Sequence, residues 1–233
     1  MNYQFSIIVF LFVSVFFNVI QKENNPNKCE VGLTGFHKIE LSASNSTPVP
    51  YGLNKNLMST DYPLVTIGNQ TWMAKNISYN SGGACYNNQI DNCITYGRLY
   101  SWDEVMQPSG DDSPCPPGFH VPTAEEWLTL MDNYGGPTQC GPSLKSNDFW
   151  PSSVSNTNSS CFSIVPAGTM SDDGTFNLLN EGTAFWTATE SAFPLTAHVI
   201  VFQDEQDGII LNSENYPISM DKDARVSCRC IQD

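Results

Sequence analysis

The sequence predicts an α+β domain that is stabilised by disulfide bonds. Two helical segments come early in the chain and strand-like segments come late, which is typical of α+β folds rather than of repeated strand–helix–strand units. Eight cysteines, an even number without a Cys-x-x-Cys pair, indicate a disulfide framework in an exported chain. With 233 residues, of which 40% are hydrophobic, the chain can also bury a sizeable core.

The charge balance argues against two classes of partner. The chain carries 10 Lys and Arg against 24 Asp and Glu, a formal net charge of −14. Such a surface repels phosphate groups, so we expect neither nucleic acid nor an anionic membrane surface as a partner. Glycans and proteins remain as the expected ligands.

The N-terminal part of the chain predicts export. Residues 1–20 carry no charged side chain, and the apolar run over 5–20 is shorter than the ~20 residues that span a bilayer. We therefore interpret 1–20 as a signal peptide and expect no membrane span after its removal. Residues 21–60 are rich in Asn, Ser and Pro and predict a polar arm or linker before a domain at 61–233.

The domain begins with a predicted hairpin and a short helix. Apolar residues alternate on both sides of a Gly-Asn-Gln turn at 68–70, a pattern that predicts two strands. In the hairpin we expect Val65 and Ile67 to face Trp72 and Ala74. A first helix is predicted within 97–106, where Leu99, Trp102, Val105 and Met106 fall on one face.

The second helix has the clearest local signals. Thr123 is a natural N-cap, and Glu126, three residues later, completes a capping box. Trp127, Leu130 and Met131 form the apolar stripe of this helix, and glycines at 135–136 are expected to end it.

The second half of the domain is predicted to be loop-rich and then stranded. Residues 137–183 contain many Pro, Ser, Asn and Gly, with one short strand candidate at 162–165. Four strands are predicted after them, at 184–190, 197–202, 208–211 and 224–231. In the last of these, Val226, Cys228 and Cys230 alternate with Ser227 and Arg229, so we expect one buried face.

Two features of the cysteines follow from their spacing. Cys85 and Cys93 flank a short polar segment and form the easiest local pair. Cys228 and Cys230 are two residues apart, so on a strand they face the same side and need separate partners.

Three ordered motifs carry a resemblance to a known family. The chain resembles the Fibrobacter succinogenes major paralogous domain over about 61–233. The resemblance rests on TIGNQTWMAKNISY (66–79), CYNNQIDNCITYGRLYSWDEV (85–105) and CPPGFHVPTAEEWLTL (115–130). Members of that family are mostly exported or surface proteins without a described active site.

A more distant resemblance implies the fold. HVPTAEEW (120–127) and RVSCRC (225–230) are similar to segments of the formylglycine-generating-enzyme group, which has a C-type-lectin-like fold. This resemblance implies two helices on a small antiparallel sheet, a long loop region and paired chain ends. By the same analogy Cys115 is expected to bridge to Cys230, which leaves Cys140 for Cys161 and Cys29 for Cys228.

No catalytic constellation is visible in the sequence. No Ser lies in a nucleophile elbow, and His120, beside the second helix, is expected to be a structural hydrogen-bonding residue. We therefore predict that the protein is not an enzyme. An enzyme of the formylglycine-generating type is an alternative, for which Cys228 and Cys230 would have to supply thiolates.

The candidate binding residues lie in the loop region and in two acidic turns. Clustered Asp oxygens are possible calcium ligands, although Asp and Gly are also common in ordinary solvated turns. Trp150 is the one tryptophan outside the periodic and family-motif segments, so we expect it to be exposed. The candidates are Trp150, Asp172, Asp173, Asp204 and Asp207.

Together these observations predict a secreted or cell-surface binding or adhesion module. Its binding face is expected on 137–183 together with the turn at 204–208, with a glycan or a protein as ligand and calcium as the one possible cofactor. A structural component of a surface coat is a further alternative.

Overall fold

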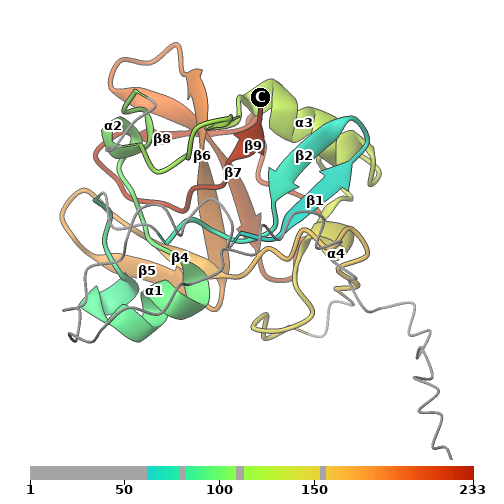
Figure 1. The fold of residues 1–233 in the computed structure, drawn as a ribbon, viewed down its shortest axis with the longest axis horizontal. Coiled ribbons are helices and arrows are strands. Elements are labelled where there is room, and N and C mark those ends of the chain that lie inside the picture. The colour runs from blue at the N-terminus through green and yellow to red at the C-terminus, as the bar shows by residue number, and fades with distance from the viewer. Residues whose placement is uncertain (1–61, 79–81, 109–112, 153–155) are drawn as a thin grey trace, which may run out of the picture.

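The computed structural model describes residues 62–78, 82–108, 113–152 and 156–233. The predicted signal peptide, the polar arm and Cys29 lie outside these residues. Within the described residues the fold is α+β, with short helices and mostly strands in two sheets (Figure 1). The α+β class predicted from the sequence is thereby confirmed.

The first sheet brings the two ends of the domain together. Its strands are β1 (Leu64–Ile67), β2 (Gln70–Met73), β9 (Ile231–Gln232) and β3 (Phe119–His120), in the order β1-β2-β9-β3. The predicted hairpin is confirmed: Val65 lies opposite Trp72, although Ile67 pairs with Gln70 and Ala74 follows the strand. The pairing of Trp72 with Ile231 joins the start of the domain to its end.

The second sheet is larger and contains one parallel pair. Its strands run in the order β5-β4-β6-β7-β8. They are β4 (Ala167–Met170), β5 (Phe176–Leu179), β6 (Gly182–Glu190), β7 (Thr196–Gln203) and β8 (Ser219–Asp221). β4 and β5 lie inside the segment predicted to be loop-rich, and β4 pairs with β6 in parallel. The expectation of one small antiparallel sheet is therefore wrong.

The predicted second helix is α3 (Ala124–Asp132), and its capping box is present. The Thr123 hydroxyl accepts a hydrogen bond from the Glu126 amide at 3.2 Å, and the Glu126 carboxylate accepts one from the Thr123 amide at 2.8 Å. Trp127, Leu130 and Met131 are fully buried, as their spacing predicts. The helix lies beside the sheet of β6, where the Thr189 hydroxyl accepts a hydrogen bond from the Ala124 amide.

The other four helices of the described residues are short, and three of them were not predicted. α2 (Trp102–Val105) begins after the predicted start because Leu99 and Tyr100 form bridges with Ala84 and Val226. A single-turn 3-10 helix, η2 (Tyr86–Asn88), precedes α1 (Ile90–Tyr96), and α4 (Gly141–Leu144) lies in the loop-rich segment. α1 carries no apolar stripe, because Ile90 and Ile94 are exposed, so periodicity gave no signal for it.

Aromatic side chains fill the core between the helix and the sheets. Trp127 contacts Trp72, Phe162 and Phe185, with ring centroids 4.9, 5.6 and 5.2 Å away. Such tilted and edge-to-face contacts add to the large apolar area that each ring buries. All four of these side chains are fully buried.

The segment at 224–231 is less regular and more buried than predicted. It forms isolated bridges at Arg225, Val226 and Ser227 before β9 begins. Both of its faces are buried, because Ser227 and Arg229 are buried as well as Cys228 and Cys230. The expectation of a single buried face is therefore wrong. The predicted strand at 208–211 likewise reduces to bridges at Ile209 and Leu211, and the candidate at 162–165 to a bridge at Ile164.

Candidate functional site

The acidic turn at 204–208 is held against the body of the domain. The Lys145 ammonium donates to the carbonyl oxygens of Gln203 and Gln206 at 2.6 and 2.8 Å, and Lys145 is 1% exposed. Burial lowers the pKa of Lys145, whereas Asp204 and Asp207 raise it. These two carboxylates therefore compensate a buried cation, a structural role that the sequence analysis did not foresee.

Close packing on the other side of this turn leaves little room for a ligand. A Cβ on Gly141 would lie 2.8 Å from the carbonyl oxygen of Asp207, so only glycine allows this approach. The Gly141 amide also donates to that oxygen at 2.7 Å. The turn thus packs against the segment that contains α4, and the two do not form an open binding face.

Trp150 is buried, so the expectation that it is exposed is wrong. Its side chain is packed in the core with 8% exposure, and its indole N–H donates to the carbonyl oxygen of Ile164 at 2.9 Å. The Lys145 ammonium lies 4.6 Å from the centroid of its ring, a cation–π contact. Trp150 therefore offers no free ring face for a sugar.

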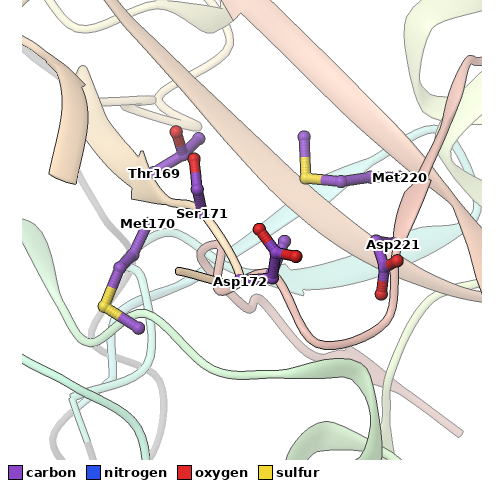
Figure 2. Close-up of a pocket in the computed structure, with 7 residues that line it drawn as sticks. Thr169, Met170, Ser171, Asp172, Met220 and Asp221 are labelled. Atoms are coloured by element: carbon purple, nitrogen blue, oxygen red, sulfur yellow. The ribbon is translucent and has the colours of Figure 1, made fainter. Parts of the chain in front are cut away.

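A pocket of about 170 Å³ lies between the end of β4 and β8. Two hydrogen bonds between the backbones of Met170 and Arg225, at 2.8 and 2.9 Å, bring these distant segments together. Figure 2 shows Thr169 and Ser171 on one side of the β4 end and Met170 on the other. The lining residues are Thr169, Met170, Ser171, Asp172, Met220, Asp221 and Ala224.

The two aspartates of the pocket are oriented by their own turns. The Asp172 carboxylate accepts a hydrogen bond from the Asp173 amide at 3.0 Å, and the Asp221 carboxylate accepts one from the Asp223 amide at 3.0 Å. Both side chains are exposed and carry further acceptor capacity toward a ligand. Asp173 instead caps the turn itself, and hydrogen bonds from Thr175 lower the pKa of its carboxyl.

An apolar hairpin end lies next to β8, the strand that contributes Met220 and Asp221 to the pocket. Thr196, at the start of β7, pairs with Asp221, and the Lys222 amide donates to the carbonyl oxygen of Leu195 at 2.9 Å. Phe193 and Leu195, in the loop between β6 and β7, are 70% and 76% exposed. Of the sequence candidates only Asp172 lines the pocket. Sequence reasoning missed Asp221 and Phe193, which no local motif marks.

The four predicted calcium ligands do not converge on one site. Asp172 lines the pocket and Asp173 caps its turn, whereas Asp204 and Asp207 act electrostatically on Lys145 and raise its pKa. Among the described residues, no three carboxylates place ligand oxygens within 4.8 Å of one another. A calcium ion at the pocket would therefore need ligand atoms from the bound molecule or from water.

The cysteines follow the predicted pairing in part. The disulfides Cys85–Cys93 and Cys115–Cys230 are both present. Cys140 and Cys228, however, are buried free thiols, so the expected pairs Cys140–Cys161 and Cys29–Cys228 are wrong. Cys161 takes part in a disulfide. Burial raises the pKa of both free thiols to about 12, which leaves them almost entirely protonated at neutral pH.

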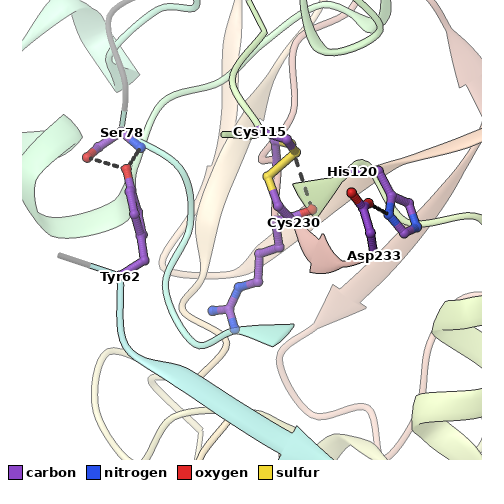
Figure 3. The surroundings of a disulfide bond; sticks show 8 residues. Tyr62, Ser78, Cys115, His120, Cys230 and Asp233 are labelled. Carbon is purple, nitrogen blue, oxygen red and sulfur yellow. Dashed lines mark hydrogen bonds and ion pairs between the residues drawn. A yellow bond between two sulfur atoms is a disulfide. The ribbon is translucent and has the colours of Figure 1, made fainter. Parts of the chain in front are cut away.

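His120 links the last strand to the second helix. Its Nδ1 lies 2.8 Å from Asp233 and its Nε2 lies 3.0 Å from Glu126 (Figure 3 shows the Asp233 contact). Partial burial lowers the pKa of His120, but its hydrogen bonds to the two carboxylates outweigh this effect and raise the pKa. The expected structural role of His120 agrees with these contacts.

Replacing His120 is expected to make the stability less dependent on pH. The pKa of His120 is raised in the folded state. Its contribution to the free energy of unfolding is therefore complete below the pKa of the unfolded state, about 6.5, and is lost as pH rises through the pKa of the folded state. The loss in His120→Asn should therefore be larger at pH 6 than at pH 8.5, by no more than about 1 kcal/mol because these exposed groups are screened. Urea unfolding at both pH values measures it. Asp233→Asn, which keeps one carboxylate, should give a smaller difference, and equal losses at both pH values would contradict the prediction.

These features define a disulfide-braced α+β domain with a small surface pocket. A family model for the Fibrobacter succinogenes major domain matches residues 65–232, so the chain belongs to this family, as its motifs predict. No curated protein and no solved structure matches the chain.

None of the helices in the described part of the chain is long and apolar enough to cross a bilayer.

Proposed function

We propose that this protein is an exported, non-enzymatic binding or adhesion module that recognises carbohydrate at the pocket between β4 and β8. The observation that carries the proposal is the lining of this pocket. Four of the residues that line this space of about 170 Å³ carry a hydroxyl or a carboxylate: Thr169, Ser171, Asp172 and Asp221. Sugars present closely spaced hydroxyls, which hydroxyl and carboxylate groups of this kind can pair with.

The exposed Phe193 favours a sugar, which has an apolar ring face, over a ligand that has polar groups only. Carbohydrate sites combine hydrogen bonding to hydroxyls with an apolar ring face that packs on the sugar. Phe193 and Leu195 supply an apolar surface beside β8 (Figure 1 shows the loop between β6 and β7 projecting from the sheet). In this proposal Phe193 takes the role that the sequence suggested for Trp150.

Two further expectations belong to this proposal. Export to the cell surface is supported by the apolar run at 5–20 and by the disulfides Cys85–Cys93 and Cys115–Cys230. A C-type-lectin-like fold is supported by the pairing of β2 with β9 and by the bridge from Cys115 to the last strand.

The geometry gives less support to an enzyme of the formylglycine-generating type. Such an enzyme would need accessible thiolates at Cys228 and Cys230. Cys230 is held in a disulfide, and Cys228 is a fully buried thiol. Because denaturation would expose Cys228 in any case, only thiol reactivity in the folded protein bears on this alternative.

A glycan array that includes cell-wall polysaccharides tests the proposal. We expect binding that weakens at least roughly tenfold in Asp172→Asn/Asp221→Asn, because hydrogen bonds to charged groups contribute about 1.5–3 kcal/mol. Asp148→Asn is the matched control, since Asp148 is exposed and does not line the pocket. The array is repeated with calcium and with a chelator, to show whether the ion takes part.

Two outcomes would contradict the proposal. Unchanged glycan affinity in the double variant would place the site elsewhere. No glycan binding by the wild-type protein would favour a protein ligand, and reversible polymerisation at high protein concentration would then favour the surface-coat alternative.

A further inference from the structure

Three sulfur atoms lie together in the core. The Sγ atoms of Cys115, Cys228 and Cys230 are all within 4.8 Å of one another. Cys115 and Cys230 form a disulfide (Figure 3), whereas Cys228 is a free thiol. A buried thiol in this position faces a disulfide that it can reach without a large movement of the chain.

The backbone of the last segment explains this arrangement. Cys228 and Cys230 are separated by one residue in an extended segment, so their side chains point to the same side. Hydrogen bonds to the carbonyl oxygens of both cysteines fix the segment, from the Ile77 amide at 2.9 Å and from the Met73 amide at 3.0 Å. Cys115 therefore has two sulfur atoms of one segment within 4.8 Å of its own Sγ atom.

We propose that Cys228 is an alternative disulfide partner of Cys115, and that the domain exchanges between a Cys115–Cys230 form and a Cys115–Cys228 form. This inference is independent of the proposed carbohydrate site. The Cys228 thiolate attacks the Sγ atom of Cys115, and the Cys115–Cys228 bond forms as the Cys115–Cys230 bond breaks. The electron pair goes to the Cys230 sulfur, which takes up the proton that Cys228 released. One disulfide and one thiol exist before and after, so no oxidant or reductant is consumed.

Chain entropy does not choose between the two forms. The native bridge joins residues that are 115 positions apart, and the alternative bridge to Cys228 closes a loop only two residues shorter. Because the entropy of loop closure depends on the logarithm of loop length, this difference is negligible. Packing around the three sulfurs therefore decides which form dominates.

The exchange would be slow at neutral pH and would change the contacts of the last strand. Burial raises the pKa of Cys228 to about 12, so the attacking thiolate is scarce at pH 7 and increases with pH. Cys115 lies just before β3, and β3 pairs with β9 through His120 and Ile231. A bridge to Cys228 would draw Cys115 back along the strand and strain this pairing, so the two forms would differ near His120.

Disulfide mapping by mass spectrometry tests the proposal, because trypsin cleaves between the two cysteines. Cleavage after Arg225 and Arg229 places Cys228 and Cys230 on separate peptides, 226–229 and 230–233. The folded protein is incubated at pH 7, 8 and 9, quenched with acid and alkylated. We expect a Cys115–Cys228 cross-link together with alkylated Cys230, formed roughly ten times faster for each pH unit.

Matched variants separate this exchange from general scrambling. In Cys228→Ser, Cys230 should stay in its disulfide with Cys115 and should not be alkylated. Cys140→Ser, which removes the other buried thiol, should behave as wild type. Cross-links to Cys140 that form as fast as those to Cys228 would overturn the proposal. In oxidised, folded Cys230→Ser we expect the Cys115–Cys228 bond. Free thiols at both positions of that variant would also overturn it.

Discussion

Arg229→Met is expected to lower the free energy of unfolding by about 3–5 kcal/mol, the usual cost of breaking a buried charged network. The Arg229 side chain is 1% exposed. Its Nε donates to the Asn76 side-chain oxygen at 2.9 Å, and its terminal nitrogens donate to the carbonyl oxygens of Ser163, at 2.9 Å, and Phe162. Methionine fills much of the volume but leaves three oxygen acceptors in the core without a donor.

The charge of Arg229 is stabilised by dipoles and by rings. Among the described residues no carboxylate forms an ion pair with it, and its guanidinium carbon lies 4.4 Å from the centroid of the Phe162 ring. Burial lowers the pKa of Arg229 to about 9, so the group is still a cation at neutral pH. This cation holds the last segment of the chain to the loop at 162–163, which places β9 between β2 and β3.

Urea unfolding followed by tryptophan fluorescence measures the effect. Arg229→Lys keeps the charge but cannot reach all three acceptors, so we expect it to recover only part of the loss. Arg225→Met is the matched control, because Arg225 pairs with Glu104 at a half-buried site and should cost about 1 kcal/mol. Equal losses for the two Met variants would show that the buried network is not the main contribution.

The elements that the sequence predicted correctly are those with local signals. The capping box of Thr123 and Glu126 and the stripe of Trp127, Leu130 and Met131 lie within one short segment, and α3 forms where they predict it. The turn of the first hairpin is equally local, and its register is confirmed at Val65 and Trp72. In these cases the sequence neighbours are also the structural neighbours.

The errors occur where a distant contact decides the environment. Arg229 alternates with cysteines, a pattern that normally places a charged side chain in solvent, but Phe162 and Asn76 cover it. Trp150 lies in a loop-rich segment and is nevertheless packed in the core, where its indole donates to the carbonyl oxygen of Ile164. Neither contact leaves a signal in the local sequence.

The candidate site could be predicted only in part for the same reason. Asp172 was identified because acidic turns are visible in the sequence. Its partner Asp221 is about fifty positions away, and the bridge between Met170 and Arg225 brings the two segments together. Asp204 belongs to a second acidic turn, yet Lys145 makes that turn part of the packed structure.

Removing the Cys115–Cys230 bridge is expected to destabilise the domain more than removing Cys85–Cys93. The two bridges join residues that are 115 and 8 positions apart. The chain-entropy relation gives about 4–5 kcal/mol for the long loop and about 2–3 kcal/mol for the short one. The long bridge also connects β9 to the segment before α3, so it ties the last strand to the rest of the first sheet.

Two double variants test this difference: Cys115→Ala/Cys230→Ala and Cys85→Ala/Cys93→Ala. Using pairs avoids a new free thiol beside Cys228, which could otherwise form a substitute bond with the remaining cysteine. Urea unfolding without a reductant should rank the variants in the order of loop length. An equal or larger loss for the short bridge would show that native-state packing around the sulfurs, rather than the restriction of the unfolded chain, is the main source of stability.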